Sequence, residues 1–124
     1  MIELSVASIL STAPAISALV GSRVYPVTLP TDPTLPALDY KFVGGSSTAT
    51  QDTYGTQRYR LEVNCWGNTY SDAVTLRAAV VATLSQYSAD GVFIAYLMPQ
   101  DFFEDEILQY RAMAEFYVFA NFNT

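Results

Sequence analysis

The sequence predicts an α+β fold, in which an antiparallel sheet of about four strands carries helices packed on one face. Apolar residues recur at helical spacing over 3–20 and 70–87, and they alternate with polar residues over 58–66. The resulting order is helix, helix, strand, strand, helix, strand, strand, and hairpin-like connections join both strand pairs. We expect residues 1–124 to form a single domain, because a chain of this length fits one core.

The first helix is predicted over residues 3–12, where Val6 and Leu10 share one face. Pro14 ends this helix, because the residue before a proline avoids the helical region. The same proline can open a second helix at its first turn. Gly21 supplies the left-handed residue at which the second helix stops.

The stretch from Leu4 to Ser22 carries no charge, which raises the question of a membrane span or a signal peptide. Its serines, proline and glycine make it too polar and broken for a span. The only early charge is Glu3, whereas a signal peptide begins with a basic segment. We therefore expect no membrane association.

Residues 26–36 contain four prolines, which exclude a helix or a sheet interior and predict a stiff, extended connector. A strand of mixed faces follows over 38–43 and is expected to end at Gly44-Gly45. Residues 44–57 are small and polar with no apolar period, so they are expected to form a flexible loop or arm at a hairpin tip.

Residues 58–66 form the clearest strand, with Leu61, Val63 and Cys65 on one face. Because no cation or base shares that face, Cys65 is expected to be a small buried side chain with an unreactive thiol.

The main amphipathic helix is predicted over 70–87 and begins at the capping pair Thr69-x-x-Asp72. A short apolar strand then runs from Val92 to Met98, and Pro99 is expected to end it.

The last strand is predicted over 110–122, and aromatic side chains alternate onto both of its faces. Something must therefore pack behind it, either a helix on each side or a neighbouring subunit. The candidate interface with a subunit or a tube consists of three aromatic and two basic residues: Trp66, Tyr117, Phe119, Arg58 and Arg60.

The composition disfavours catalysis. The chain has no histidine, which removes imidazole-based catalysis and imidazole zinc sites, and its one cysteine excludes an intrachain disulfide. The net charge of −6 argues against a general nucleic-acid binder. Because 51% of the residues are apolar in so short a chain, we expect some apolar surface to be covered by assembly. We expect no enzymatic activity and no cofactor.

Residues 101–106 (DFFEDE) form an acidic and aromatic cluster. Paired carboxylates can bind metal or act as acid and base, but the spacing of a Ca²⁺ loop is absent. A solvated acidic turn between strands is the simpler interpretation. The four acids of the cluster are Asp101, Glu104, Asp105 and Glu106.

Two stretches of the chain resemble bacteriophage tail-completion proteins, also called tail terminators or head-to-tail joining proteins. Val24–Pro26, Leu29-Pro30 and Leu35–Tyr40 are similar to the family's "YP…LP…LPALVY" stretch. Arg60–Ala73 (RLEVNCWGNTYSDA) is similar to its "V-Q-I-D-C-W-A-x-T-Y-x-E-A" stretch, with Asn64 where the family often has an acid. The resemblance covers roughly residues 2–98, extends loosely to the last strand, and matches 101–106 poorly.

This resemblance implies a structural virion protein, made in the host bacterial cytoplasm and located at the tail or the head–tail interface. It implies a ring, most often of six copies, that caps the tail tube and meets the head connector or stopper protein. DNA would pass through such a ring without specific binding. A bore that does not hold DNA should not be basic, so we expect the acids of 101–106 to line the lumen or a rim.

Two other functions stay open at this point. A head-completion or stopper protein sits one layer higher in the same joint, and mixing with tail tubes or with filled heads separates the two. A small metal-binding or ligand-binding α+β domain would instead use the acids of 101–106.

Overall fold

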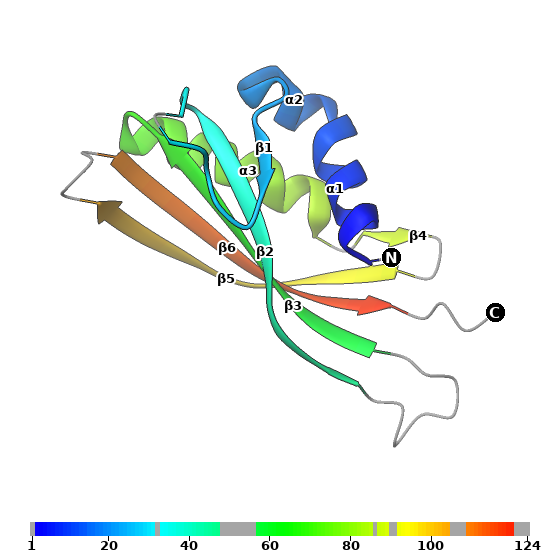
Figure 1. Ribbon diagram of the computed structural model, residues 1–124. Coiled ribbons are helices and arrows are strands. Elements are labelled where there is room, and N and C mark those ends of the chain that lie inside the picture. The colour runs from blue at the N-terminus through cyan, green and yellow to red at the C-terminus, as the bar shows by residue number, and fades with distance from the viewer. Residues whose placement is uncertain are drawn as a thin grey trace.

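A computed structural model of the chain describes residues 2–31, 33–47, 57–85, 87–89, 92–104 and 109–120. These residues form one sheet with helices on a single face (Figure 1). The helices are α1 (Ile2–Thr12), α2 (Pro14–Val20) and α3 (Tyr70–Leu84). The strands are β1 (Val24–Pro26), β2 (Ala37–Ser47), β3 (Gln57–Gly67), β4 (Ser88–Ala89), β5 (Val92–Glu104) and β6 (Gln109–Ala120).

The sheet has six strands in the order β1-β2-β3-β6-β5-β4, so the prediction of about four strands is too low. It is also mixed, because β1 runs parallel to β2 while the other pairs are antiparallel. The two unpredicted strands have three and two residues, which is too short for an alternating pattern to be recognised. The predicted α+β class and the helices on one face are confirmed.

The two N-terminal helices follow the sequence prediction closely. Pro14 stands in the first turn of α2, where its missing N–H costs no helical hydrogen bond. Gly21 follows α2 with a φ of 59° and donates its N–H to the Ser17 carbonyl, so it ends the helix as expected.

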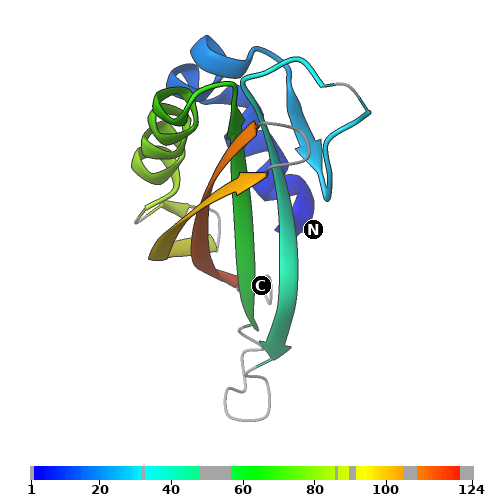
Figure 2. The ribbon, with the colours of Figure 1, turned by 90° about the vertical axis from the view of Figure 1, so that its left-hand side faces the viewer.

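The predicted connector 26–36 begins inside a strand, because Pro26 is the last residue of β1. The chain then reverses at Val27, which has a φ of 70°, and the Thr28 N–H donates to the Pro26 carbonyl at 2.8 Å. This is a γ-turn of the rare positive-φ kind. It directs the rest of the connector away from the sheet (Figure 2).

Strand β2 does not end at Gly44-Gly45 as predicted but continues to Ser47. A one-residue register shift between Phe42 and Gly45 marks a β-bulge opposite β3. Glycine lowers strand propensity, yet the pairing with β3 holds this segment in the sheet. The remainder of the predicted arm, residues 48–56, lies outside the described residues.

Helix α3 begins at the predicted cap, where the Thr69 hydroxyl oxygen accepts the Asp72 N–H at 3.1 Å. It ends at Leu84, three residues earlier than the prediction of 70–87. Strand β5 passes through Pro99 to Glu104, so the expected end at Pro99 is wrong. The first four residues of the predicted acidic turn therefore belong to a strand, and Asp105 and Glu106 lie outside the described residues.

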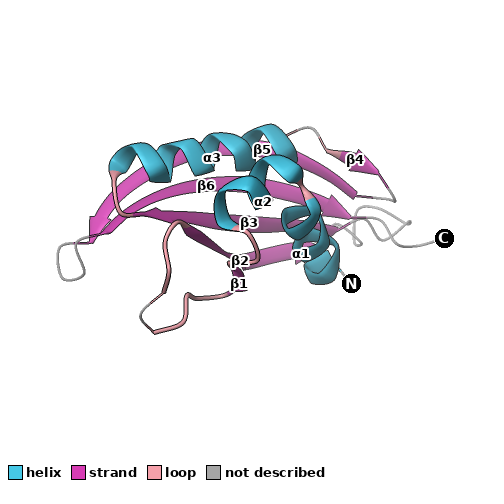
Figure 3. Ribbon diagram, turned by 90° about the horizontal axis from the view of Figure 1, so that it is seen from above, coloured by secondary structure: helices cyan, strands magenta, loops and turns pink. Residues whose placement is uncertain are grey.

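The core lies between the sheet and the three helices (Figure 3). Leu61, Val63 and Cys65 of β3 and Phe116 of β6 are fully buried there. Each helix contributes buried apolar side chains to the same cluster: Val6, Leu10, Ile16, Val20, Ala73, Leu76, Val80 and Leu84. The placement of Cys65 under the helices confirms the predicted strand register.

Candidate assembly surface

The opposite side of the sheet, which we call the helix-free face, carries no helix of the described chain (Figures 1 and 3). Its side chains are those that alternate with the core residues in the strand register. They include Asp39, Lys41, Arg58, Arg60, Glu62, Asn64, Trp66, Phe93, Arg111, Met113, Glu115, Tyr117 and Phe119. All five residues of the predicted interface therefore lie on one face.

The structure does not bring these five residues into one cluster. Trp66 lies near one end of β3, opposite Arg111 of β6. Arg58 lies eight residues away at the other end, opposite Phe119, a separation of about 27 Å along the strand. Arg60 lies between them, opposite Tyr117. We call the part of the helix-free face around Trp66 and Arg111 the tryptophan end. The part around Arg58, Tyr117, Phe119 and Phe93 is called the aromatic end.

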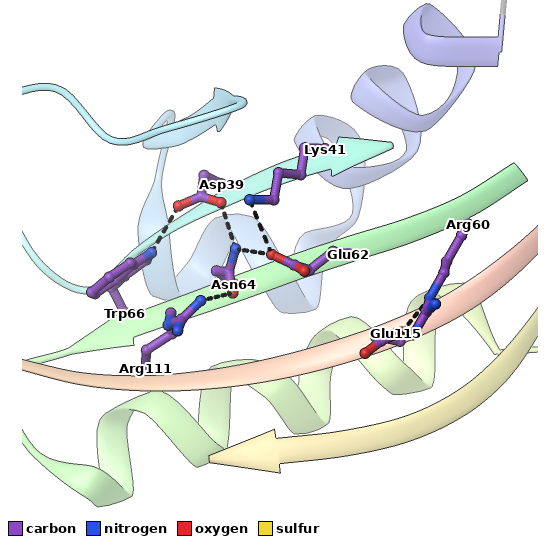
Figure 4. Close-up of polar contacts among 8 residues, drawn as sticks. All are labelled: Asp39, Lys41, Arg60, Glu62, Asn64, Trp66, Arg111 and Glu115. Carbon is purple, nitrogen blue, oxygen red and sulfur yellow. Dashed lines mark hydrogen bonds and ion pairs between the residues drawn. The ribbon is translucent and has the colours of Figure 1, made fainter. Parts of the chain in front are cut away.

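The tryptophan end is a polar network across three strands (Figure 4). The Asn64 amide nitrogen donates to the Asp39 carboxylate at 2.9 Å and to the Glu62 carboxylate at 3.0 Å, and the Asn64 oxygen accepts from Arg111 at 3.1 Å. The Trp66 Nε1–H donates to the second Asp39 oxygen at 2.8 Å. Both Asp39 and Asn64 are only 3% exposed, although no helix or second sheet of the described chain covers them.

Two cations close the network at its margins. The Arg111 guanidinium carbon lies 5.6 Å from the centre of the Trp66 ring, a cation–π distance. Lys41 Nζ lies 3.5 Å from the Glu62 carboxylate. The long side chains at the margins shield the short polar side chains between them from water.

Burial raises the pKa of the Asp39 carboxyl above its ordinary value of 3.8. The hydrogen bonds from Asn64 and Trp66 and the charge of Lys41 oppose this rise, because each stabilises the carboxylate. The Glu62 charge adds to the rise. The network therefore contains a carboxylate whose charge is costly and whose partners compensate only part of the cost.

In the middle of the face, Arg60 forms an ion pair with Glu115, and its Nε donates to Oε2 at 2.6 Å. Glu115 is 7% exposed, whereas the Arg60 side chain is about half exposed. The buried carboxylate is thus neutralised by a cation that still reaches the surface.

The aromatic end is made of neighbouring aromatic rings that are partly exposed. The Arg58 guanidinium lies 4.8 Å from the centre of the Tyr117 ring. The Phe119 ring centre lies 6.1 Å from that of Tyr117 and 6.1 Å from that of Phe93. Phe93 is 43% exposed, one of the few large apolar side chains in the described chain with that much surface. Exposed aromatic and arginine side chains of this kind are typical of protein interfaces.

The described part of the predicted acidic cluster lies at the same end of the sheet as Trp66, because Phe102 of β5 is in register with Arg111, which is opposite Trp66. Asp101 and Glu104 belong to β5, in register with Ala112 and Gln109, and the other two acids lie outside the described residues. Among the residues whose placement is described, no group of three or more potential metal ligands is found. In the same part of the chain, no helix has the length and apolarity needed to cross a membrane.

The sequence prediction named five residues of this face and missed the others, among them Asp39, Asn64, Arg111, Glu115 and Phe93. A signal existed for three of them, because Asn64, Arg111 and Glu115 alternate with core residues in the two clearest strands. Their burial could not be foreseen, since it depends on which strands are neighbours. Among the described residues, this face presents oriented charges and aromatic rings.

Comparisons with known proteins agree on one class. The sequence model of a family described as tail completion protein gp17 matches residues 5–116. Among solved structures, the fold is similar to a chain of the virion of a native gene transfer agent particle, with a TM-score of 0.70 and 17% identity over 92% of this chain and 90% of that chain. At that identity the likeness concerns the fold. No curated protein sequence matches the chain.

Proposed function

The chain belongs to the tail completion protein gp17 family, and from this membership we propose that it forms a closed ring that terminates the phage tail tube and joins it to the head connector. Membership makes it a structural protein of the virion tail. Formation of a ring, attachment to the tail tube and contact with the head connector are the parts of this function that we propose. We also propose that its role is purely structural, with no catalysis and no cofactor.

The observation that carries the proposal is the aromatic end of the helix-free face. Phe93, Phe119, Tyr117 and Arg58 lie together without a helix above them. A monomer gains nothing from leaving such rings half exposed, whereas an assembly buries them. We propose that these residues, with Arg60 and Trp66, contact a neighbouring subunit or the tube.

We further propose that the acids of 101–106 form a rim that faces a partner or the DNA path. Strand β5 carries Asp101 and Glu104 toward the end of the sheet at which β6 begins. An acidic rim repels DNA phosphates and lets the genome pass without holding it. Reversal of the four acids to lysine should slow DNA ejection from otherwise complete particles, and an unchanged ejection rate would contradict the rim.

The function is tested with the purified chain, tails that lack a terminator, and DNA-filled heads. We expect native mass spectrometry to give one closed oligomer, and we expect that oligomer to bind tails and to make them competent to join heads. Binding to heads but not to tails would instead identify a stopper protein. A chain that stays monomeric at all concentrations and binds neither particle would contradict the proposal.

Phe119→Ala is the diagnostic variant, with Thr75→Ala as its control. Phe119 lies at the aromatic end, whereas Thr75 is an exposed residue of α3 on the other side of the molecule. We expect Phe119→Ala to weaken oligomer formation or tail binding by tenfold or more, as interface aromatics do. Thr75→Ala should change neither.

A further inference from the structure

The sheet has two long open edges. The edge strands are the two shortest, and within the described residues β1 accompanies β2 only at Leu38–Tyr40, while β4 accompanies β5 only at Val92 and Phe93. Among the residues that the structure describes, the rest of β2 (41–47) and of β5 (95–104) has a neighbouring strand on one side only (Figures 1 and 2). Open edges of this length are templates for pairing with another chain.

The direction of the peptide groups shows what the β2 edge offers. The Leu38 N–H donates to the Arg23 carbonyl, and the Tyr40 carbonyl accepts from Val27, so both residues direct their peptide groups away from β3. Alternation gives the same direction to Phe42. The one-residue shift of the bulge then transfers it to Gly45 and Ser47. The β2 edge therefore presents complete N–H and C=O pairs at 42, 45 and 47.

The β5 edge also presents outward peptide groups, but a register shift and Pro99 interrupt their regular alternation. The Ile94 N–H donates to the Tyr87 carbonyl, so Ile94 directs its peptide groups away from β6, and Tyr96 does the same. The register shift between Tyr96 and Met98 moves the outward direction to residues 99, 101 and 103. Pro99 thus stands where its missing N–H costs the β5–β6 ladder nothing.

We propose that the β2 edge of one copy pairs with the β5 edge of the next copy, so that the sheets of neighbouring subunits become one continuous sheet around the ring. This inference rests on the ring of the proposed function and names the contact that closes it. The β2 edge and the β5 edge are the two opposite edges of one sheet. A head-to-tail contact that closes by rotation requires two different surfaces of this kind.

Strand direction fixes the type of pairing. Strands β2 and β5 run in opposite directions, because β2, β3, β6 and β5 are successive antiparallel neighbours. Rotation about a ring axis keeps the sense of each strand along that axis. For strands that run along the axis, β2 therefore meets the next copy's β5 antiparallel, the stronger kind of ladder. The open part of β2 contains one cation, Lys41, and no acid, whereas the open part of β5 contains two acids, Asp101 and Glu104, and no cation, so the two segments carry opposite charge. Lys41 also lies 3.5 Å from Glu62 of its own subunit.

The open parts are also offset along the strands. That of β2 lies toward the sheet end where β3 begins, whereas that of β5 extends to the end where β6 begins. Pairing them displaces each subunit along the strand direction, and such a stagger is what a closed, tilted sheet needs. A strand from a different protein would cover one edge and leave the other open, whereas a second copy covers both.

Disulfide cross-linking tests the pairing in the complete chain. Val43, an exposed residue of the β2 edge, is replaced by cysteine together with one β5 position, taken in turn from Ala95, Leu97, Gln100 and Phe102. Because the two edges lie on opposite sides of the sheet, any bond between them joins two chains. After mild oxidation we expect a ladder of linked chains that ends at the closed ring, strongest at one β5 position. Val43→Cys with Thr75→Cys on α3 is the control pair.

Two outcomes of this experiment separate the inference from the proposed function. A closed ring in native mass spectrometry with cross-linking no higher than the control at all four positions would overturn the edge pairing alone. Absence of any ring would overturn the ring of the proposed function, and the edge pairing with it.

Proline and alanine substitutions give a second test, because they are expected to change the strength of subunit association in opposite directions. Gly45→Pro removes an outward N–H and takes no donor from the β3 ladder. We expect Gly45→Pro to weaken subunit association about tenfold, Gly45→Ala to leave it unchanged, and Pro99→Ala, which restores a donor, to strengthen it several-fold. Sedimentation over a concentration series measures all three. Equal association of the two Gly45 variants would overturn the inference.

Discussion

The two faces of the sheet use alternate residues of the same strands, yet they are stabilised in different ways. The helix-covered face consists of apolar side chains such as Leu61, Val63 and Phe116, which are fully buried by the helices. On the helix-free face, Asp39 and Asn64 are almost as buried, but the shielding comes from neighbouring polar and aromatic side chains of the same sheet.

This difference between the two faces suggests that one face serves folding and that the other serves assembly. Apolar packing tolerates changes in shape and supplies most of the folding free energy. A polar network specifies position instead, because each group requires its partner at hydrogen-bond distance. The tryptophan end of the helix-free face is therefore held by directional hydrogen bonds, whereas the aromatic end exposes apolar surface that we propose a partner covers.

The largest expected contrast between the faces is in thiol reactivity. Burial raises the pKa of the Cys65 thiol, and the side chain is inaccessible under the helices. We expect a thiol reagent to label Cys65 slower than the same thiol in denaturant by a factor of about 10³ or more, because labelling requires opening of the core. A cysteine at Val43 on the exposed β2 edge should react at once. Similar native rates at 65 and 43 would mean that the helices do not seal that face.

The next contrast concerns two phenylalanines of the same strand. Phe116→Ala removes a fully buried ring and should lower the free energy of unfolding by about 3–5 kcal/mol. Phe119→Ala, on the other face, should lower it by less than about 1.5 kcal/mol while impairing assembly. Urea denaturation of the two variants measures the difference. Equal losses would mean that the helix-free face is a second core of the subunit.

A smaller effect is expected within the polar network. Trp66→Phe keeps a ring beside Arg111 but removes the N–H that donates to the Asp39 carboxylate. We expect a loss of about 1–3 kcal/mol in the free energy of unfolding, since a buried charged acceptor is left with one partner fewer. An unchanged unfolding midpoint would show that water replaces the indole at no cost. Tyr25→Phe, on β1 outside the network, is a matched control for a small aromatic change.

The smallest contrast is a dependence on pH. Burial raises the pKa of Asp39, so the folded state binds this proton more tightly than the unfolded state does. The stability contributed by the group is therefore fully present below its ordinary pKa of 3.8 and is lost as the pH rises through the folded value. We expect the stability of the natural chain relative to Asp39→Asn to increase as the pH falls from 7 toward 4. A constant difference between the two chains would contradict the raised pKa.

Most of the fold could be predicted where local chemistry decides it. Pro14, Gly21 and Thr69 set helix boundaries through their own backbone preferences, and the alternation in β3 and β6 reflects a sheet covered on one face. Strands β1 and β4 could not be predicted, because two or three residues become a strand only through the neighbour that they pair with. Pro99 misled for a related reason: a proline ends a central strand but not an edge strand whose N–H points outward.

The candidate site was predictable in its face but not in its contacts. Alternation alone placed Trp66, Arg58 and Tyr117 on one side of the sheet. That Trp66 binds Asp39, and that Asn64 joins β2 to β6, depends on strand order and register, which follow from tertiary pairing. Whether the five predicted residues contact a partner stays a prediction.

The position of the single tryptophan allows intrinsic fluorescence to report on one face of the sheet without an added label. Trp66 is the only indole in the chain, and it lies on the helix-free face, half-buried beside a guanidinium, rather than in the core. Intrinsic fluorescence excited at the indole band therefore reports the environment of the helix-free face. It is expected to change little when only the helices change. Docking of a partner over the tryptophan end would change the emission, whereas tightening of the core beneath the helices would leave it unaltered.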